Sequence, residues 1–125
     1  MNFAKRLLQI AGWYGLLVLT PQFFLERQVA VENPPAITHP EYFYGFVGVA
    51  VAWQIAFLIM ARDPVRYRPL LLAAVVEKLS FGITTIALFA TDRLAKSVLV
   101  FGLIDFTLGV LFIIAWRKLR NLPSA

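Results

Sequence analysis

The sequence contains no cysteine and a single histidine, and charged residues make up only 15% of it. Without cysteine, the chain has no disulfide, no thiolate nucleophile and no cysteine-bound metal centre. Membrane enzymes that exchange electrons between a quinone and a protein dithiol are excluded for the same reason. A single imidazole is also a weak signal for a metal site, because such sites combine several nitrogen, sulfur or carboxylate ligands.

Apolar residues are abundant instead. Hydrophobic residues make up 60% of the chain and the mean hydropathy is +0.74, well above the usage of ordinary globular domains. The net charge of +5 and the pI of about 10.0 would suit nucleic-acid binding in a soluble protein. Here, however, the basic residues stand at the ends of apolar runs, as they do around membrane spans. The composition therefore predicts a membrane protein with no nucleic-acid partner.

Four apolar runs are long enough to cross a bilayer, which takes about 20 residues of helix. They cover about residues 7–25, 41–61, 69–90 and 94–116. The pattern predicts an all-α, polytopic membrane protein, a four-transmembrane-helix bundle that forms a single membrane domain over residues 1–125. The first run has the basic start of a signal peptide, but no small-x-small cleavage site follows, so we expect it to be retained. Pro21 is expected to kink this helix or to end its regular part.

The distribution of basic residues orients the predicted bundle, because cytoplasmic loops are enriched in lysine and arginine. Eight basic residues fall at one end of the four runs and three at the other, while Lys78 lies inside a run. The two sets are Lys5, Arg6, Arg62, Arg66, Arg68, Arg117, Lys118 and Arg120 against Arg27, Arg93 and Lys96. We therefore expect a multi-pass protein of the inner (plasma) membrane with both termini in the cytoplasm.

Two local predictions concern the second run and the segment before it. The polar segment 26–40 contains three prolines, so we expect an ordered loop rather than a helix. His39 could join Glu41 in a metal or proton site, but support of the helix start is the simpler interpretation. Within the run, small residues at three- and four-residue spacing predict a smooth face for a neighbouring helix. These residues are Gly45, Gly48, Ala52 and Ala56.

Five polar side chains interrupt the apolar runs, and an ionised group inside a span costs a few kcal/mol or more. They are Tyr14, Gln54, Glu77, Lys78 and Asp105. At about 1.5 Å per residue from the predicted cytoplasmic ends, Tyr14, Gln54 and Glu77 lie roughly 12 Å deep and Asp105 roughly 18 Å deep. These depths predict a shared polar layer that binds a ligand or a proton. The alternative is a set of mutually neutralised groups that only support packing.

Glu77 and Lys78 are adjacent, so they project about 100° apart on a helix and are expected to have different partners. Small and polar residues at helical spacing predict that Glu77 points into the bundle. Its predicted inward face consists of Ala73, Ala74, Glu77, Ser80 and Thr84. Asp105 is placed inward in the same way by Gly102 and Gly109. Lys78 is expected either to reach toward water or to pair with Asp105.

The stretch from His39 to Phe81, HPEYFYGFVGVAVAWQIAFLIMARDPVRYRPLLLAAVVEKLSF, covers about a third of the chain. It resembles a set of small four-helix bacterial membrane proteins in which a similar arginine-rich turn precedes a similar glutamate-lysine pair. In length and helix count the chain also resembles DoxX-type proteins. Both resemblances imply the fold, and neither implies an activity.

Three classes of function remain open. We rank first the binding or transport of a proton or of a small lipophilic or cationic ligand through Glu77. The second class is a structural subunit of a homo-oligomer or of a larger membrane complex. The third is an enzyme that acts on a lipid-soluble substrate with Glu77 and Asp105 as acid and base. No nucleophile motif, phosphate loop or metal-ligand spacing supports an enzyme, so we expect no cofactor, and the lipid bilayer is the expected surrounding.

Overall fold

The computed structural model describes residues 2–123, which form helices and no strand. The elements are α1 (Asn2–Leu19), the 3-10 helix η1 (Thr20–Phe24), α2 (Glu26–Glu32), α3 (Pro40–Met60), α4 (Leu70–Ala90) and α5 (Lys96–Leu119). Four stretches are long and apolar enough to cross a membrane. They are Asn2–Phe24, Pro40–Met60, Leu70–Ala90 and Lys96–Leu119. The predicted all-α architecture with four spans is therefore confirmed.

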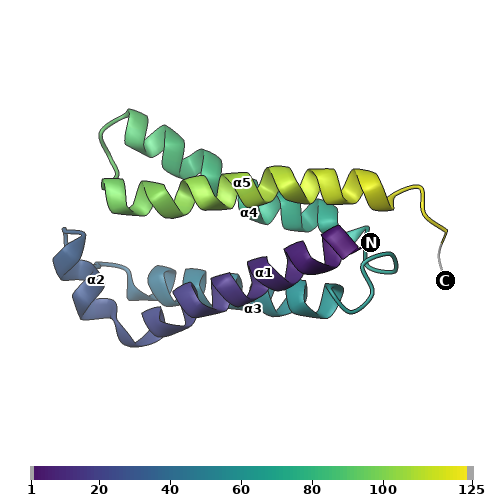
Figure 1. Ribbon diagram of the computed structural model, residues 1–125. Helices are drawn as coiled ribbons and strands as arrows, with labels where there is room; N and C mark the ends of the chain where they lie inside the picture. The colour runs from purple at the N-terminus through teal and green to yellow at the C-terminus, as the bar shows by residue number, and fades with distance from the viewer. Residues whose placement is uncertain (1, 124–125) are drawn as a thin grey trace.

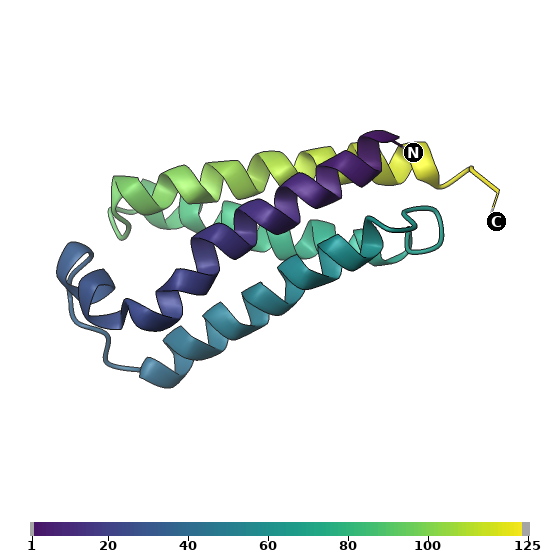
Figure 2. The same ribbon diagram turned by 60° about the horizontal axis from the view of Figure 1, so that its bottom comes forward.

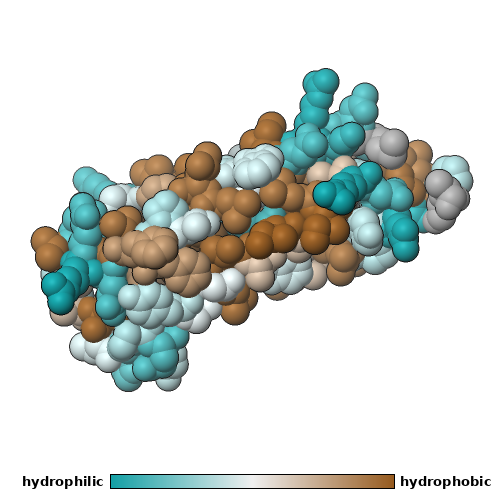
Figure 3. Space-filling view, turned by 90° about the horizontal axis from the view of Figure 1, so that it is seen from below, coloured by the Kyte–Doolittle hydropathy of each residue, from teal (hydrophilic) through white to brown (hydrophobic). Residues whose placement is uncertain are grey.

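The surface agrees with this architecture. Apolar side chains form a broad band along the face shown in Figure 3, and polar side chains gather at its two ends. Each long helix exposes large apolar residues, among them Trp13 at 59%, Val49 at 64%, Val76 at 66% and Val100 at 55%. So much exposed apolar surface is unfavourable in water but is expected in contact with lipid. The molecule has the form of a multi-pass membrane protein.

The long helices associate as two antiparallel pairs, α1 with α3 and α4 with α5 (Figure 1). The start of α1 and the end of α5 lie at the same end of the bundle, and α1 diverges from α5 toward the other end (Figure 2). We call the end that holds the start of α1 and the end of α5 the terminal half and the other end the far half. The terminal half comprises residues 2–11, 54–78 and 105–123, and the far half comprises residues 12–53 and 79–104.

Large apolar side chains pack together in the terminal half. Leu8, Phe57, Leu71 and Phe112 come from four different helices and are 0% exposed. The residues of the buried apolar cluster are Ala4, Leu7, Leu8, Ala11, Phe57, Met60, Ala61, Val65, Leu71, Ala74, Leu108, Phe112, Ala115 and Leu119. All of them lie in the terminal half. This core therefore joins the two helix pairs to each other.

The connector between α3 and α4 is tied to this same end. The guanidinium of Arg68 donates a hydrogen bond to the carbonyl of Leu119 at 3.0 Å and another to the carbonyl of Leu122. The carbonyl of Leu119 also accepts from the backbone N–H of Leu122 at 3.0 Å, so Arg68 adds a second donor at the end of α5. The bonds from Arg68 hold the basic connector against the last turn of α5.

The far half is packed by small residues. Its buried residues are Gly12, Gly15, Val47, Ala50, Gly82, Thr85 and Gly102. The glycines permit close approach within each pair: a Cβ at Gly82 would lie 2.9 Å from the backbone of Phe106, and one at Gly12 would lie 2.9 Å from the Gln54 carbonyl oxygen. Large apolar side chains that would fill the space between the two pairs are lacking among the buried residues here. Packing in this half is therefore mainly within the pairs.

The end of the first span follows the prediction from Pro21. α1 ends at Leu19, and Pro21 occupies the first turn of η1. Proline has no backbone N–H to donate to an earlier carbonyl. The side chain of Gln22 donates to the carbonyl of Val18 at 3.2 Å instead, so one carbonyl at this helix end is satisfied.

Two local predictions are wrong. Residues 26–40 are not only a loop, because α2 occupies Glu26–Glu32. Its residues include good helix formers, and the first proline of the segment comes after its last turn. The small residues of α3 do not form a helix interface either, since a Cβ at Gly45 would have no neighbour within 4 Å. Burial of Gln54 and Phe57 turns this small-residue face outward.

Candidate functional site

Lys78 lies at the centre of the buried face of α4 and is only 2% exposed. The residues of that face, at three- and four-residue spacing, are Leu71, Ala74, Lys78, Gly82 and Thr85. Ser80 and Thr84 are exposed, so the predicted inward face is wrong at these two positions. Ala74 is buried and Glu77 Oε2 reaches the interior, as predicted. Leu71 packs in the apolar core and Gly82 packs on α5, and together they set the rotation of α4. This rotation places the lysine in the interior.

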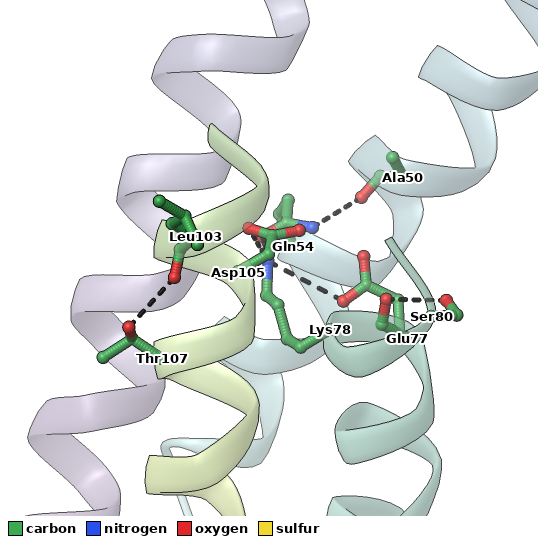
Figure 4. Close-up of polar contacts among 8 residues, drawn as sticks. All are labelled: Ala50, Gln54, Glu77, Lys78, Ser80, Leu103, Asp105 and Thr107. Atoms are coloured by element: carbon green, nitrogen blue, oxygen red, sulfur yellow. Dashed lines mark hydrogen bonds and ion pairs between the residues drawn. The ribbon is translucent and has the colours of Figure 1, made fainter. Parts of the chain in front are cut away.

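The ammonium of Lys78 meets oxygen atoms from three helices (Figure 4). It donates to Gln54 Oε1 at 3.5 Å, and it lies 3.5 Å from Asp105 Oδ1 and 3.7 Å from Glu77 Oε2. The predicted ion pair between Lys78 and Asp105 is confirmed. The expectation of different partners for Glu77 and Lys78 is wrong, because their long side chains converge although their Cβ atoms project apart. We call Gln54, Glu77, Lys78 and Asp105 the lysine cluster.

Gln54 uses both ends of its amide. Its Nε2 donates to the carbonyl of Ala50 at 2.9 Å, while its Oε1 accepts from Lys78. The side chain is 0% exposed, as its place in the predicted polar layer requires. A Cβ at Gly15 of α1 would overlap this amide, and only glycine leaves it room. Gly15 is not among the predicted site residues, although glycine at positions 12 and 15 is a detectable signal of close helix approach.

Aromatic residues close the cluster on the side of the terminal half. Lys78 Nζ lies 5.3 Å from the ring centroid of Phe57, and the Phe57 and Phe112 rings meet edge to face at 5.2 Å. A cation over an aromatic ring is stabilised by the charge distribution of the ring. Phe57 follows Gln54 by one helical turn and is a further residue of the site that was not predicted. The lysine cluster therefore lies at the boundary between the core and the far half.

The two carboxylates are less buried than the lysine. The side chains of Glu77 and Asp105 are 17% and 16% exposed, and Glu77 Oε2 is buried without a hydrogen bond. With all three groups ionised, one ammonium faces two carboxylates, which leaves one negative charge in excess. An uncompensated charge inside a membrane protein is unfavourable. Binding of one positive charge, or of one proton, would neutralise the cluster.

Tyr14, the fifth predicted site residue, packs half-buried against the apolar core. Within residues 2–123, no hydrogen bond joins its hydroxyl to the lysine cluster. The structure thus brings together four of the five predicted residues. Tyr14 lies beside them as part of the packing.

The hydroxyl groups near the cluster are satisfied by their own helices. Ser80 donates to the carbonyl of Glu77 at 3.1 Å, and Thr107 donates to the carbonyl of Leu103 at 2.9 Å (Figure 4). Such bonds to an earlier turn let a hydroxyl face lipid without an unpaired donor. These two residues are therefore not part of the candidate site.

His39 lies outside the spans, directly before α3. Its Nδ1 is 3.1 Å from Glu41 Oε1, and its ring stacks on Tyr42 with centroids 4.9 Å apart. The side chain makes no capping hydrogen bond to the helix, although the carbonyl of His39 accepts from the backbone of Tyr42. In the described part of the chain, no three His, Cys, Asp or Glu side chains group closely enough to hold a metal ion.

Known proteins add no further constraint on the site. No protein-family model matches the chain, and neither does a curated protein or a solved structure. The geometry of the lysine cluster is therefore the evidence from which a function can be proposed.

Proposed function

We propose that this membrane protein binds a proton at the lysine cluster, held by the carboxylates of Glu77 and Asp105. The observation that carries the proposal is the excess of one carboxylate over the single ammonium, together with the buried Glu77 Oε2 that has no hydrogen-bond donor. A proton on either carboxylate removes the excess charge. It also converts one carboxylate into a hydrogen-bond donor.

The contacts of Lys78 favour a proton over a larger cation. Its ammonium already occupies the space between Gln54, Glu77 and Asp105, and it would repel a metal ion placed among the same oxygens. A proton needs no additional space. The cationic group of a lipophilic molecule could approach only the exposed edges of the two carboxylates.

Infrared spectroscopy of the protein in lipid tests the proposal, because a protonated carboxyl group absorbs separately from an ionised one. We expect wild type to show a band of a protonated buried carboxyl at neutral pH. The band should shift or disappear in Glu77→Gln or in Asp105→Asn. Glu32→Gln is a matched control, because Glu32 lies in α2, outside the lysine cluster, and within residues 2–123 its side chain accepts a hydrogen bond from Gln28 alone.

Identical carboxyl bands in wild type, Glu77→Gln and Asp105→Asn would overturn proton binding at the cluster. Proton uptake by proteoliposomes extends the test from binding to transport. Transport through this site would require uptake that is lost in at least one of the two variants and kept in Glu32→Gln.

A structural role is the second candidate, because Lys78 links α3, α4 and α5 through three oxygen atoms. For this role, Glu77→Gln and Asp105→Asn should keep or improve the stability, since each retains hydrogen bonding and removes the cost of a buried charge. A structural cluster would also show unchanged proton uptake in both variants.

We propose further that the terminal half faces the cytoplasm, in the inner membrane. The eight basic residues of the cytoplasmic set all belong to the half that contains the start of α1 and the end of α5. Alkaline phosphatase fused after residue 125 should be inactive, and a cytoplasmic fluorescent reporter at the same position should be bright. The opposite pair of results would reverse the orientation.

A further inference from the structure

A second polar site lies in the far half, away from the lysine cluster. It is a surface pocket of about 370 Å³ that is open over much of its extent. The lining residues come from η1, α2 and the start of α3. They are Phe23, Phe24, Leu25, Glu26, Arg27, Gln28 and Tyr44.

The polar lining residues differ in how they are paired. The hydroxyl of Tyr44 donates to Glu26 Oε2 at 3.5 Å, and Gln28 donates to Glu32 at 3.2 Å. Arg27 is exposed and makes no hydrogen bond or ion pair within residues 2–123. The pocket therefore carries one unpaired guanidinium beside one carboxylate that accepts only a long hydrogen bond.

The pocket lies where the first span ends and the second begins, at Phe24 and Pro40. The Phe23 and Tyr44 rings stack with centroids 6.4 Å apart, and Phe24 is 85% exposed. Aromatic side chains gather at this level in membrane proteins because the headgroup region suits their apolar rings and polar edges. A lipid whose chains lie against Phe24 would have its phosphate near Arg27.

From these contacts we infer that the pocket binds the zwitterionic headgroup of a glycerophospholipid. Arg27 binds the phosphate, because the guanidinium presents paired N–H donors to two phosphate oxygens. Glu26 accepts the ammonium group of the same headgroup. One positive and one negative side chain in one pocket match a headgroup that carries both charges, whereas a purely anionic headgroup would face the carboxylate of Glu26.

Native mass spectrometry of delipidated protein in mild detergent measures this binding, with dioleoylphosphatidylethanolamine as the probe. We expect Arg27→Gln and Glu26→Gln each to weaken binding, Arg27→Gln by about tenfold, the scale of one lost charge-assisted pair. Arg93→Gln is the matched control, because Arg93 lies at the same end of the bundle and does not line the pocket. It should leave binding nearly unchanged. The melting temperature of each variant shows that the fold is kept.

Three results would overturn the inference. Equal losses in Arg27→Gln and Arg93→Gln would show general attraction of lipid to basic residues. Equally tight binding of dioleoylphosphatidylglycerol would contradict the zwitterionic match, because this lipid has no ammonium group. Equally tight binding of soluble phosphoethanolamine would show that the occupant need not be a lipid. None of these results bears on proton binding at the lysine cluster.

Discussion

The two halves of the bundle are held together differently. In the terminal half, large side chains such as Phe57 and Phe112 are fully buried between the two helix pairs. In the far half, glycines such as Gly82 and Gly102 bring helices together within the α4 and α5 pair. Lys78 lies at the boundary, with aromatic packing on one side and partly exposed carboxylates beside it. The buried ammonium is thus held against a packed apolar core, while its carboxylate partners are partly exposed.

Removal of the lysine should have the largest effect on this arrangement. Lys78→Met leaves two largely buried carboxylates without their cation, so we expect a loss of about 3 kcal/mol in the free energy of unfolding, the low end for a broken buried pair because both carboxylates are partly exposed. Unfolding in SDS mixed micelles measures it. The triple change Lys78→Met, Glu77→Gln and Asp105→Asn should recover much of the loss, and exposed Lys96→Met is the control. If Lys78→Met were as stable as wild type, the proposal that Lys78 holds the cluster together would be wrong.

Two phenylalanines, one in each half, test whether large side chains stabilise the terminal half more than the far half. Phe57→Ala removes a ring from the core and from beneath Lys78, and we expect a loss of roughly 2–3 kcal/mol, below soluble-protein values because lipid is as apolar as the core. Phe46 lies in the far half, is 47% exposed and stacks on Phe81 at 6.0 Å. Phe46→Ala should cost much less in the same unfolding measurement. Equal losses would remove the difference between the halves.

Two glycines give a smaller effect of the same kind. Gly15→Ala places a methyl group on the Gln54 amide, and relief of the overlap should cost about 1–2 kcal/mol and displace the Gln54 side chain. Gly45→Ala meets no atom within 4 Å and should leave the stability nearly unchanged. The melting temperatures of Gly15→Ala and Gly45→Ala in the same detergent measure this difference. If Gly45→Ala were the more damaging change, α3 would have a partner on its outward face.

The smallest effect is expected at the far end. His39 pairs with Glu41 at the surface, so His39→Ala should change the stability by less than about 0.5 kcal/mol, as most surface substitutions do. Calorimetric titration with zinc provides the second measurement. Tight zinc binding that is lost in His39→Ala would assign a metal site to this end.

The spans and the polar residues within them could be predicted from the sequence, because both depend on local composition. About 20 consecutive apolar residues suffice to cross the hydrocarbon layer whatever their neighbours are. Gln54 in such a run must find an internal partner, since lipid offers none. The Lys78 to Asp105 pair was also predictable, because a buried ammonium needs a carboxylate and few are available in the spans.

The rotation of each helix was decided by the tertiary structure. Glu77 and Lys78 are separated by about 100° on the helix. Which of the two lies on the buried face of α4 depends on how Leu71 and Gly82 pack against other helices. The outward face of Gly45 was decided in the same way, by the burial of Gln54 on the opposite side. Local composition is therefore enough to define which segments cross the membrane and which polar groups need partners. The tertiary structure decided which faces meet, because that choice sums many contacts between residues far apart in the chain.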